Sequence, residues 1–356
     1  MQPKQSHIAV LGVTGYAGAE LARLLLGHPR LAGTSPLFLG RESQGRADSA
    51  RESLTAIHPQ LAGLTTDQLS VEPLSWELLA SHGVKVLFLA TPHEQSRKLA
   101  PEALARGLRI VDLSGAWRLN DPANRAVYKF SDESSPVAVQ TQSEAVYGMP
   151  ELHREAIAKA NLVANPGCYA TTIILALKPL IAAGWVDLNH GIVCDAKSGV
   201  SGAGKEPTAK THFMYAADNL SAYGFFGHRH TGELLEQLNV AADAITFAPH
   251  LLPIPRGILA TIYVTFREKH TAEEVEACLR GFYAESPMVR IRPAGQLPQI
   301  QHVVRTNFCD LGFQLAPDGR RTIVISCLDN LLKGAAGQGV QNLNVMSGWP
   351  QTEGLL

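Results

Sequence analysis

The sequence lacks an excess of charge of either sign. Its 31 Lys and Arg residues nearly balance its 32 Asp and Glu residues, which gives a formal net charge of −1. Without a basic excess, nothing in the composition indicates binding to nucleic acid or to an anionic membrane. No uncharged apolar run approaches the roughly 18–20 residues that span a bilayer, and the start of the chain has no signal-peptide core. The composition therefore predicts a soluble globular protein with small-molecule ligands.

Cysteines are few and have no paired spacing. The five cysteines, at positions 168, 194, 278, 309 and 327, form no C-x-x-C pair, and their number is odd. This pattern argues against both a disulfide framework and a zinc cage. It fits a reducing compartment, so we expect a cytoplasmic protein.

The first third of the chain alternates strand-like and helix-like segments. His7–Val13 precedes a helix near Gly18–Leu26, Lys85–Ala90 precedes a helix near His93–Arg106, and Arg109–Leu113 forms a further strand. Alternation of this kind predicts an α/β Rossmann domain with a doubly wound, mostly parallel sheet. Since 356 residues exceed the usual size of about 100–200 residues for one domain, we expect a second domain.

The pattern changes from about residue 165. Tyr169–Ala183 is predicted as a long apolar helix and Gly191–Ala196 as a buried strand. Phe308–Leu315 and Thr322–Leu328 flank the turn sequence 317–319 (PDG), which predicts an antiparallel hairpin. These segments predict an α+β second domain with a mixed sheet.

A glycine-rich turn follows the first predicted strand. Residues 12–18 (GVTGYAG) lie between a strand and a helix, where glycines let backbone N–H groups approach a pyrophosphate. The alternative is a loop that only packs helix on strand. After the second predicted strand, Arg41 and Ser43 suit the 2′-phosphate of NADP, whereas Glu42 suits a free ribose; we favour NADP.

Cys168 is the predicted nucleophile. Pro166 and Gly167 forbid helix before it, and the long apolar helix begins just after it. A cysteine at a helix N-terminus is expected to have a stabilised thiolate, and the same N–H groups suit a developing oxyanion. The other four cysteines fit the alternative role of small core residues.

Two histidines flank a cation in residues 227–233 (GHRHTGE). Either His228 or His230 suits a general base for Cys168, and Arg229 or the second histidine suits an anionic substrate group. A metal site and a purely structural role at a helix start are the alternatives. No further ligand cluster accompanies the pair, which disfavours a metal.

A second glycine-rich loop, residues 198–205 (SGVSGAGK), ends a predicted strand and matches G-x-x-x-x-G-K. Glu206 follows where an NTPase needs Ser or Thr for Mg²⁺, and its carboxylate would repel a triphosphate. We therefore expect the loop to bind a single phosphate or the cofactor pyrophosphate.

Eight motifs in order carry a resemblance to a known family. They are GVTGYAGAEL, FLATPHEQS, VDLSGAWRL, NPGCYATT, SGVSGAGK, GHRHTGE, APHLLPIPRGI and DNLLKGAAGQ, starting at residues 12, 88, 111, 165, 198, 227, 248 and 329. Together they resemble the N-acetyl-gamma-glutamyl-phosphate reductases of arginine biosynthesis, which are related to aspartate-semialdehyde dehydrogenase. The resemblance covers nearly the whole chain.

The resemblance implies a dinucleotide-binding domain at 1–164, a catalytic and dimerisation domain at 165–330, and a C-terminal segment, 331–356, that packs back on the first domain. It implies NADP(H), a homo-dimer or homo-tetramer, no metal, and an acyl-enzyme on Cys168. The expected catalytic residues are Cys168, His228 and His230. The expected substrate-binding residues are Arg118, Ser201, Lys205, Arg229 and Arg256. The expected cofactor-binding residues are Gly12, Thr14, Gly15, Tyr16, Ala17, Gly18, Arg41, Ser43, Thr91, Ser114, Gly115, Ser198, Gly199, Gly202 and Asn330.

The expected reaction is NADPH-dependent reduction of N-acetyl-L-glutamyl 5-phosphate to the 5-semialdehyde and inorganic phosphate through a thioester on Cys168. One alternative is a related acyl phosphate, such as aspartyl phosphate or a protein-carried aminoadipyl phosphate. Another is a non-catalytic NADP-binding sensor, in which Cys168 would titrate as an ordinary thiol near about pH 8–9.

Overall fold

The computed structural model describes residues 7–40, 52–64 and 69–356, and the chain divides into two compact units. Unit 1 comprises Met1–Arg118, Phe130–Asn165 and Ala336–Leu356. Unit 2 comprises Leu119–Lys129 and Pro166–Ala335. In the described part of the chain no helix is long and apolar enough to cross a membrane.

Unit 1 is built on a sheet in which, among the described residues, all neighbouring strands are parallel except β3 and β4. In spatial order its strands are β3 (Glu52–Ser53), β4 (Ser70–Pro73), β2 (Leu37–Gly40), β1 (Ile8–Leu11), β5 (Val86–Leu89), β6 (Arg109–Asp112), β8 (Leu162–Ala164) and β7 (Ala145–Tyr147). The central strands β1 and β5 are buried along their whole length, as their continuous apolar sequences IAVL and VLFL require.

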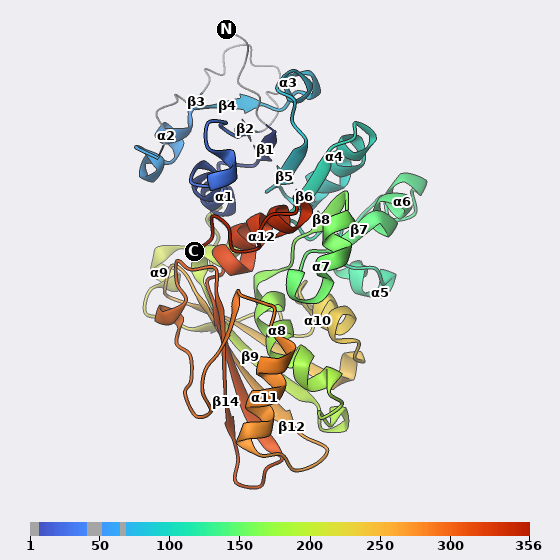
Figure 1. Ribbon diagram of the computed structural model, residues 1–356, viewed down its shortest axis with the longest axis vertical. Helices are drawn as coiled ribbons and strands as arrows, with labels where there is room; N and C mark the ends of the chain where they lie inside the picture. Colours follow the sequence, from blue (N-terminus) through green and yellow to red (C-terminus); the bar gives the residue numbers. More distant parts are fainter. Residues whose placement is uncertain (1–6, 41–51, 65–68) are drawn as a thin grey trace. The chain divides into compact units, whose positions relative to one another are not determined.

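The helices of unit 1 alternate with its strands in the chain. They are α1 (Tyr16–Leu26), α2 (Leu54–Ile57), α3 (Trp76–Ser81), α4 (His93–Ala105), α6 (Pro136–Glu144), α7 (Pro150–Lys159) and α12 (Gly337–Met346). Helix α12 is buried along its whole length and packs on α1, α7 and β6 (Figure 1). The Arg109 guanidinium donates to the carbonyl of Met346 at its end (2.6 Å).

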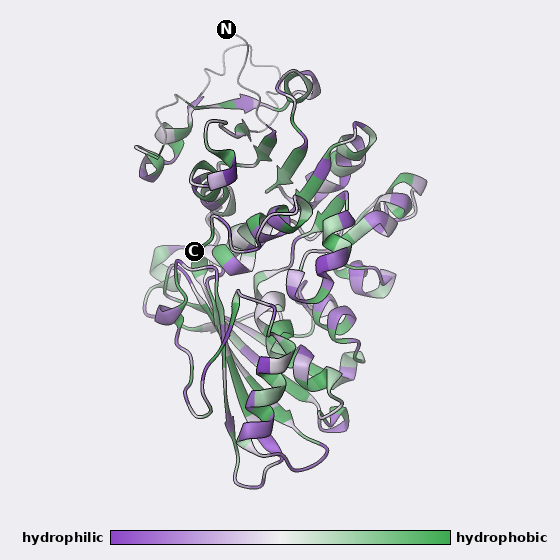
Figure 2. Cartoon of the chain, viewed as in Figure 1, coloured by the Kyte–Doolittle hydropathy of each residue, from purple (hydrophilic) through white to green (hydrophobic). Residues whose placement is uncertain are grey.

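Unit 2 is built on a mixed sheet. In spatial order its strands are β10 (Ser221–Ala222), β11 (Ile245–Leu252), β9 (Ile192–Gly199), β12 (Ile258–Thr265), β15 (Arg321–Leu328), β14 (Cys309–Leu315) and β13 (Val289–Ile291). Its helices are α5 (Pro122–Arg125), α8 (Cys168–Ala182), α9 (Phe213–Ala216), α10 (Thr231–Leu238) and α11 (Ala272–Phe282). The strands are predominantly hydrophobic (Figure 2).

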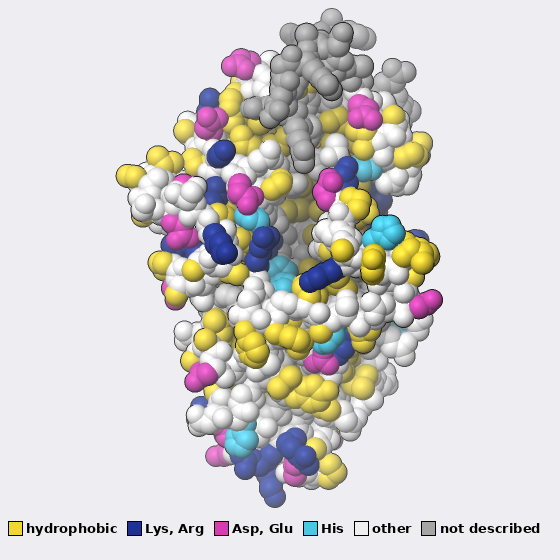
Figure 3. Space-filling view, turned by 180° about the vertical axis from the view of Figure 1, so that it is seen from behind, with side chains coloured by type: hydrophobic (Ala, Val, Ile, Leu, Met, Phe, Trp, Pro, Cys, Tyr) yellow, Lys and Arg dark blue, Asp and Glu magenta, His cyan; other side chains and the backbone are white. Residues whose placement is uncertain are grey.

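The two faces of the mixed sheet differ in what covers them. Helix α8 packs on β9, β12, β14 and β15, and α11 packs on α8 and β13. On strands β9, β12 and β15 the positions that alternate with the buried ones include Val193, Tyr263 and Ile323, which are 41%, 45% and 38% exposed. These three are direct cross-strand neighbours. From behind, hydrophobic side chains gather over the part of the surface that unit 2 forms (Figure 3).

The predicted fold class is confirmed: a mostly parallel doubly wound sheet in one unit and a mixed sheet in the other. The predicted hairpin corresponds to the antiparallel pair β14 and β15. Two stretches differ from the expected division of the chain, because Leu119–Lys129 and residues 331–335 group with unit 2. Leu119–Lys129 is tied to α10 by the Glu236 carboxylate, which accepts the N–H groups of Asn120 (2.8 Å) and Asp121 (3.0 Å).

Candidate active site

Cys168 is the first residue of helix α8 and is half-buried. Gly167, in extended conformation, precedes the helix, and its carbonyl accepts the N–H of Thr171 at 2.8 Å. The helix forms here because the apolar run that follows Cys168 buries nearly every side chain from Tyr169 to Leu180. The first N–H groups of a helix have no acceptor within it and carry a partial positive charge, so Cys168 lies where a thiolate is stabilised.

His230 lies against Gly167, the residue that precedes Cys168. A Cβ placed on Gly167 would lie 2.3 Å from Nε2 of His230, so only glycine leaves room for this imidazole. The Gly167 N–H donates to the carboxylate of Glu233, which is fully buried on α10 (2.9 Å). Glu233, which the sequence analysis did not single out, therefore fixes the Gly167 backbone beside His230.

His228 is held as a neutral imidazole. Burial, and next the neighbouring His230, lower its pKa from the ordinary 6.5 to about 3. Its Nδ1 accepts the backbone N–H of His230 (3.1 Å), so the single proton of the neutral ring is on Nε2. His228 is therefore a hydrogen-bond donor through Nε2 at neutral pH, and not a proton acceptor there.

Two tyrosines stand beside the histidines. The Tyr169 ring contacts both imidazoles edge-on, and its hydroxyl donates to the carbonyl of His250 (2.6 Å). Burial raises the pKa of both phenols, that of Tyr223 to about 12. Both phenols therefore stay protonated at neutral pH. The sequence analysis gave neither residue a role: Tyr169 lies in the motif NPGCYATT but was counted only as part of the apolar helix, and Tyr223 lies in no motif.

These residues surround a cavity of about 450 Å³ within unit 2. It is lined by Cys168, Tyr169, Ser198, Gly202, Ala203, Thr208, Lys210, Thr211, Tyr223, Gly224, Gly227, His228, Arg229, His230 and Leu251. The structure thus brings together the predicted nucleophile, both histidines and the cation between them. Lys210, Thr208 and Thr211 are lining residues that the sequence analysis missed.

The glycine loop 198–205 contributes only some of its predicted residues to this cavity. Ser198 and Gly202 line it, whereas Lys205 is exposed outside the lining. Gly199 is packed tightly, because a Cβ there would lie 2.7 Å from the backbone N of Arg256. The Ser201 hydroxyl accepts a hydrogen bond from the amide of buried Asn330 (2.9 Å).

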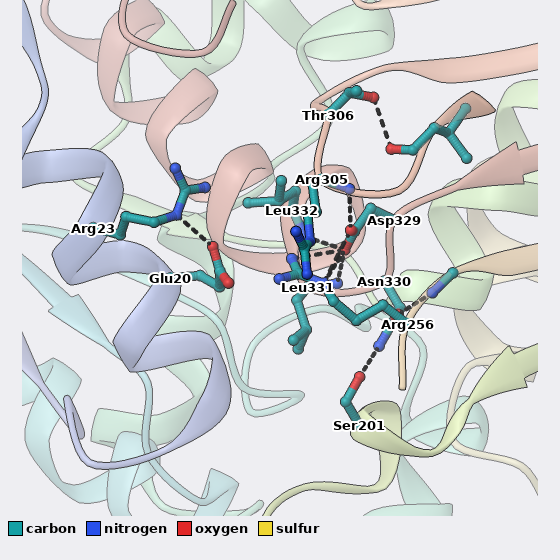
Figure 4. Close-up of polar contacts among 12 residues, drawn as sticks. Glu20, Arg23, Ser201, Arg256, Arg305, Thr306, Asp329, Asn330, Leu331 and Leu332 are labelled. Carbon is teal, nitrogen blue, oxygen red and sulfur yellow. Dashed lines mark hydrogen bonds and ion pairs between the residues drawn. The ribbon is translucent and has the colours of Figure 1, made fainter. Parts of the chain in front are cut away.

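Asn330 and Arg256 also have protein partners. The Asn330 side-chain oxygen accepts the N–H of Gly257 (2.7 Å), and its amide nitrogen donates to Ser201. The Arg256 guanidinium is paired with the buried Asp329 carboxylate (Nε to Oδ2, 3.0 Å), as Figure 4 shows. Neither residue is among those that line the cavity.

In unit 1 the predicted dinucleotide turn has the required form. Gly12 has φ +89° after β1, and a Cβ there would lie 2.3 Å from the carbonyl oxygen of Ala90. A Cβ on Gly18 would lie 2.3 Å from the carbonyl oxygen of Gly12, so these two glycines let α1 approach the turn. Gly15, the N-cap of α1, has room, with no atom nearer than 3.7 Å to its Cβ position. The start of α1 thus fits the pyrophosphate of a dinucleotide.

The other predicted cofactor-binding residues of this turn lie between its glycines or at the start of α1. Thr14 is half-buried between Gly12 and Gly15, and Tyr16 and Ala17 are the first residues of α1. Tyr16 is 46% exposed. Arg41 and Ser43, the predicted partners of a 2′-phosphate, lie outside the described residues.

Thr91 and Ser114 belong to one buried network at the ends of β5 and β6. The Asp112 carboxylate accepts hydrogen bonds from Ser96 Oγ, Ser114 Oγ and Ser114 N–H, each 2.9 Å. Thr91 and Ser96 share a hydrogen bond of 2.9 Å. Burial raises the pKa of Asp112. This network fixes the backbone around the half-buried Gly115, at the carboxyl ends of parallel strands, where doubly wound sheets bind cofactors.

Arg118 is buried in unit 1 at the end of the same segment. Its Nε donates to the carbonyl of Asn165 (2.7 Å) and its Nη2 to the carbonyl of Leu113 (2.8 Å). These two hydrogen bonds fix the backbone at Asn165 and at Leu113.

The remaining cysteines correct one expectation. Cys194, Cys309 and Cys327 are buried as predicted, but Cys278 is half-buried like Cys168, because α11 lies on the outside of α8. Burial raises the pKa of the thiols of Cys194, Cys278 and Cys327. Within the described part of the chain, no three His, Cys, Asp or Glu side chains gather as they would around a metal ion.

Known relatives share this architecture. Residues 7–160 match the family model "Semialdehyde dehydrogenase, NAD binding domain", and residues 168–330 match "Semialdehyde dehydrogenase, dimerisation domain". N-acetyl-gamma-glutamyl-phosphate reductase of Symbiobacterium thermophilum is 43% identical over 98% of this chain and 97% of the relative. The enzyme of that name from Desulfotalea psychrophila is 42% identical over the same shares.

The chain belongs to the N-acetyl-gamma-glutamyl-phosphate reductase family. Solved structures of more distant proteins share the fold. Aspartate semialdehyde dehydrogenase II from Vibrio cholerae superposes with a TM-score of 0.69 at 18% identity, over 97% of this chain and 99% of that one. Aspartate semialdehyde dehydrogenase with NADP from Candida albicans gives a TM-score of 0.65 at 15% identity, over 96% and 98%.

Proposed function

We propose that the chain catalyses the NADPH-dependent reduction of N-acetyl-L-glutamyl 5-phosphate to N-acetyl-L-glutamate 5-semialdehyde and phosphate, a step of arginine biosynthesis. The observation that carries the proposal is local. Cys168 opens α8 inside a cavity, and the His230 imidazole lies against the residue before it. Family membership supplies the identity of the substrate.

In the first half of the reaction, His230 takes the proton of the Cys168 thiol, and the thiolate attacks the acyl carbon. The oxyanion that forms faces the N–H groups at the start of α8. The bond from the acyl carbon to the phosphate oxygen then breaks, phosphate leaves with the electron pair, and a thioester on Cys168 remains.

In the second half, the thioester is reduced to the aldehyde. NADPH, when bound, supplies the hydride. The resulting hemithioacetal oxyanion collapses, the carbon–sulfur bond breaks, and the sulfur takes its proton back from His230. His228 stays neutral throughout because its pKa is lowered to about 3, so it serves as a donor through Nε2.

Cations of the cavity wall suit the anionic substrate. Arg229 and Lys210 line the cavity with the hydroxyls of Thr208 and Thr211. The substrate has a carboxylate and a phosphate, and charge-assisted hydrogen bonds to such groups are among the strongest available. Arg118, which belongs to unit 1, stays a prediction as a substrate contact; its Nε and Nη2 donate to the backbone carbonyls of Asn165 and Leu113.

For the cofactor, we propose that the Gly12–Gly18 turn holds the pyrophosphate of NADP(H) and that the Ser114–Gly115 segment lies near the nicotinamide. The room at Gly15 and the start of α1 support the first assignment. The proposal places the ribose 2′-phosphate at Arg41 and Ser43.

We further propose a cytoplasmic homo-dimer or homo-tetramer. The dimerisation-domain match and the row of exposed apolar side chains Val193, Tyr263 and Ile323 support association through the open face of the mixed sheet. All five thiols are free, as in a reducing compartment.

The reverse reaction tests the proposal. Purified protein is mixed with N-acetylglutamate semialdehyde, phosphate and NADP⁺, and NADPH absorbance is followed. We expect a signal that depends on all three reactants and disappears in Cys168→Ser. Aspartate semialdehyde serves as the competing substrate. A larger kcat/KM for that compound, or no phosphate-dependent signal with the natural sequence, would refute the substrate assignment.

A further inference from the structure

The Asp329 carboxylate, directly after β15, collects hydrogen bonds from three parts of unit 2 (Figure 4). It is fully buried. Its oxygens accept the N–H groups of Arg305 (2.7 Å), Leu331 (2.8 Å) and Leu332 (3.1 Å). They also bind the Arg256 guanidinium through Nε (3.0 Å) and Nη2 (3.1 Å). A buried carboxylate with this many donors fixes the conformation of the segment it starts.

That segment contacts two walls of the cavity. Toward the nucleophile, Gly334 is so close that a Cβ on it would lie 2.7 Å from Cβ of Cys168. Toward the glycine loop, Asn330 donates to Ser201 (2.9 Å), one residue before the lining residue Gly202. The Gly334 N–H is itself held by the carbonyl of Asp329 (2.9 Å). Displacement of Asp329 would therefore act on both walls.

Arg256 is the second anchor of the same loop. Its neighbours Ile254 and Pro255 accept the N–H groups of Val200 (2.9 Å) and Ser201 (3.3 Å). Next to it, Gly257 accepts the N–H of Gly199 (2.9 Å). The backbone around Arg256 thus holds the glycine loop, while its side chain holds the segment beside Cys168.

We propose that Asp329 and Arg256 form a positioning pair that sets the glycine loop against Cys168. The pair acts through Ser201 and Gly334 and does not touch substrate. This assignment replaces the expectation that Arg256 binds the substrate, because its charge is matched by a buried carboxylate. The effect of the pair on catalysis rests on the proposed function. Its effect on the position of the segment beside Cys168 can be measured without turnover.

A double-mutant cycle on the full-length protein separates the two roles of Arg256. The variants are Asp329→Asn, Arg256→Gln and the double substitution, measured in the reverse reaction. We expect each single variant to lower kcat about tenfold or more with KM values for phosphate and semialdehyde within about twofold. The double variant should lose no more than the worse single one, because both substitutions break the same contact.

Alkylation of Cys168 by iodoacetamide gives the readout that needs no substrate. The rate constant is measured across pH, and its plateau at high pH reports access to the ionised sulfur. Because the Gly334 backbone lies against Cβ of the half-buried Cys168, we expect its displacement to open the sulfur to the reagent. The plateau should rise at least threefold in each single variant and no further in the double one. If the natural sequence proves inactive, the proposed function fails while this measurement still decides the positioning role.

Asp310→Asn is the matched control. Asp310 is another fully buried carboxylate of unit 2, on β14, and is paired with Arg290 (2.6 Å) and Arg292. We expect lower thermal stability but unchanged kcat and alkylation plateau. Should Asp329→Asn fail to fold, the double variant and Arg256→Lys take its place. The double variant removes both charges, whereas Arg256→Lys keeps both charges but loses the two-point guanidinium contact.

Three results would overturn the proposal. The first is a KM that rises tenfold or more in Arg256→Gln but not in Asp329→Asn, together with a loss of kcat/KM in the double variant that equals the product of the two single losses. Both are expected of a substrate contact. The second is an alkylation plateau that stays at the natural value in folded variants. The third is an equal change of kcat or plateau in Asp310→Asn, which would indicate general destabilisation.

Discussion

The His230 imidazole occupies the place where a side chain on Gly167 would be, 2.3 Å from the Cβ position of the residue that precedes Cys168. Gly167 itself is in ordinary extended conformation, so what requires a glycine is the neighbouring ring and not the backbone angles. The sequence motif NPGC is thus explained by contact with a histidine 63 positions later in the chain.

Gly167→Ala is therefore expected to displace the imidazole and lower kcat by roughly 100-fold, the cost of a misplacement of about 1 Å. Gly281→Ala is the control, because a Cβ there meets no atom within 4 Å. Steady-state kinetics and thermal unfolding of both variants check this. Full activity of folded Gly167→Ala would contradict the placement of His230.

The two histidines should differ in their pH profiles. His230→Gln is expected to lower kcat by about 100-fold or more, the usual contribution of a general base. It should also remove the loss of activity at acidic pH. His228→Gln is expected to keep that acidic limb, because His228, with a pKa of about 3, does not titrate there. The measurement is kcat/KM against pH for both variants. An acidic limb that disappears only in His228→Gln would reverse the assignment.

His228 also makes stability depend on pH. Its pKa falls from 6.5 in the unfolded chain to about 3 in the fold, so below pH 6.5 the unfolded state binds a proton that the folded state does not. Its contribution to stability is present above pH 6.5 and is lost as pH falls toward 3. We expect His228→Gln to lose less stability than the natural sequence between pH 7 and pH 4, measured by urea unfolding. Equal losses would contradict the lowered pKa.

The cysteines should separate clearly in reactivity. Cys168→Ser is expected to abolish turnover, whereas Cys278→Ser should stay within about threefold, because half-buried substitutions away from the site have small effects. At pH 7, iodoacetamide should label Cys168 ahead of Cys278, whose pKa is raised by burial. Peptide mass mapping after brief labelling measures the order. Preferential labelling of Cys278 would count against a stabilised thiolate at Cys168.

Substitution of Lys210 and of Lys205 tests which lysine contacts the substrate. Lys210 lines the cavity, and its Nζ lies 5.7 Å from the centre of the Tyr223 ring, whereas Lys205 is exposed outside the lining. Lys210→Met is expected to raise KM for phosphate or for the semialdehyde about tenfold, the equivalent of about 1.4 kcal/mol. Lys205→Met should leave both KM values within about twofold. The opposite order would restore the sequence-based expectation for Lys205.

A charged substitution tests whether the open face of the mixed sheet is the interface between subunits. Tyr263→Glu places a carboxylate between Val193 and Ile323, and we expect it to shift the protein toward monomer in sedimentation velocity. Val139→Glu, at a residue of α6 that is 56% exposed, is the control and should leave the mass unchanged. An unaltered oligomer in Tyr263→Glu would exclude this face as the interface.

Local sequence was a good guide wherever one element or one turn decides the structure. The apolar runs IAVL and VLFL predict buried parallel strands because a strand covered on both faces has no polar positions. Pro166 and Gly167 predict where α8 begins, and with it the setting of Cys168. Gly12 and Gly18 predict the close approach of α1 to its turn.

Contacts between segments that are distant in the chain could not be predicted from local sequence. From the sequence, Arg256 is a cation in a loop and was expected to bind substrate. In the structure its charge is paired with the Asp329 carboxylate, 73 positions later. Lys210 and Tyr223 lie in no motif, and Glu233 ends the motif GHRHTGE without an indication of its partner. Only the fold brings these residues to Cys168 or to its neighbour Gly167. The segment Leu119–Lys129 joins unit 2 because one carboxylate on α10 accepts its N–H groups.

The sequence by itself determined the two sheets, the start of helix α8 and the glycine turns, because these follow from periodicity, from the angles that proline and glycine impose, and from the lack of a side chain. Only the tertiary structure decided which charges are left for a ligand. A side chain's availability depends on whether folding gives it a buried partner, and that partner can be any residue that packing brings within about 3 Å.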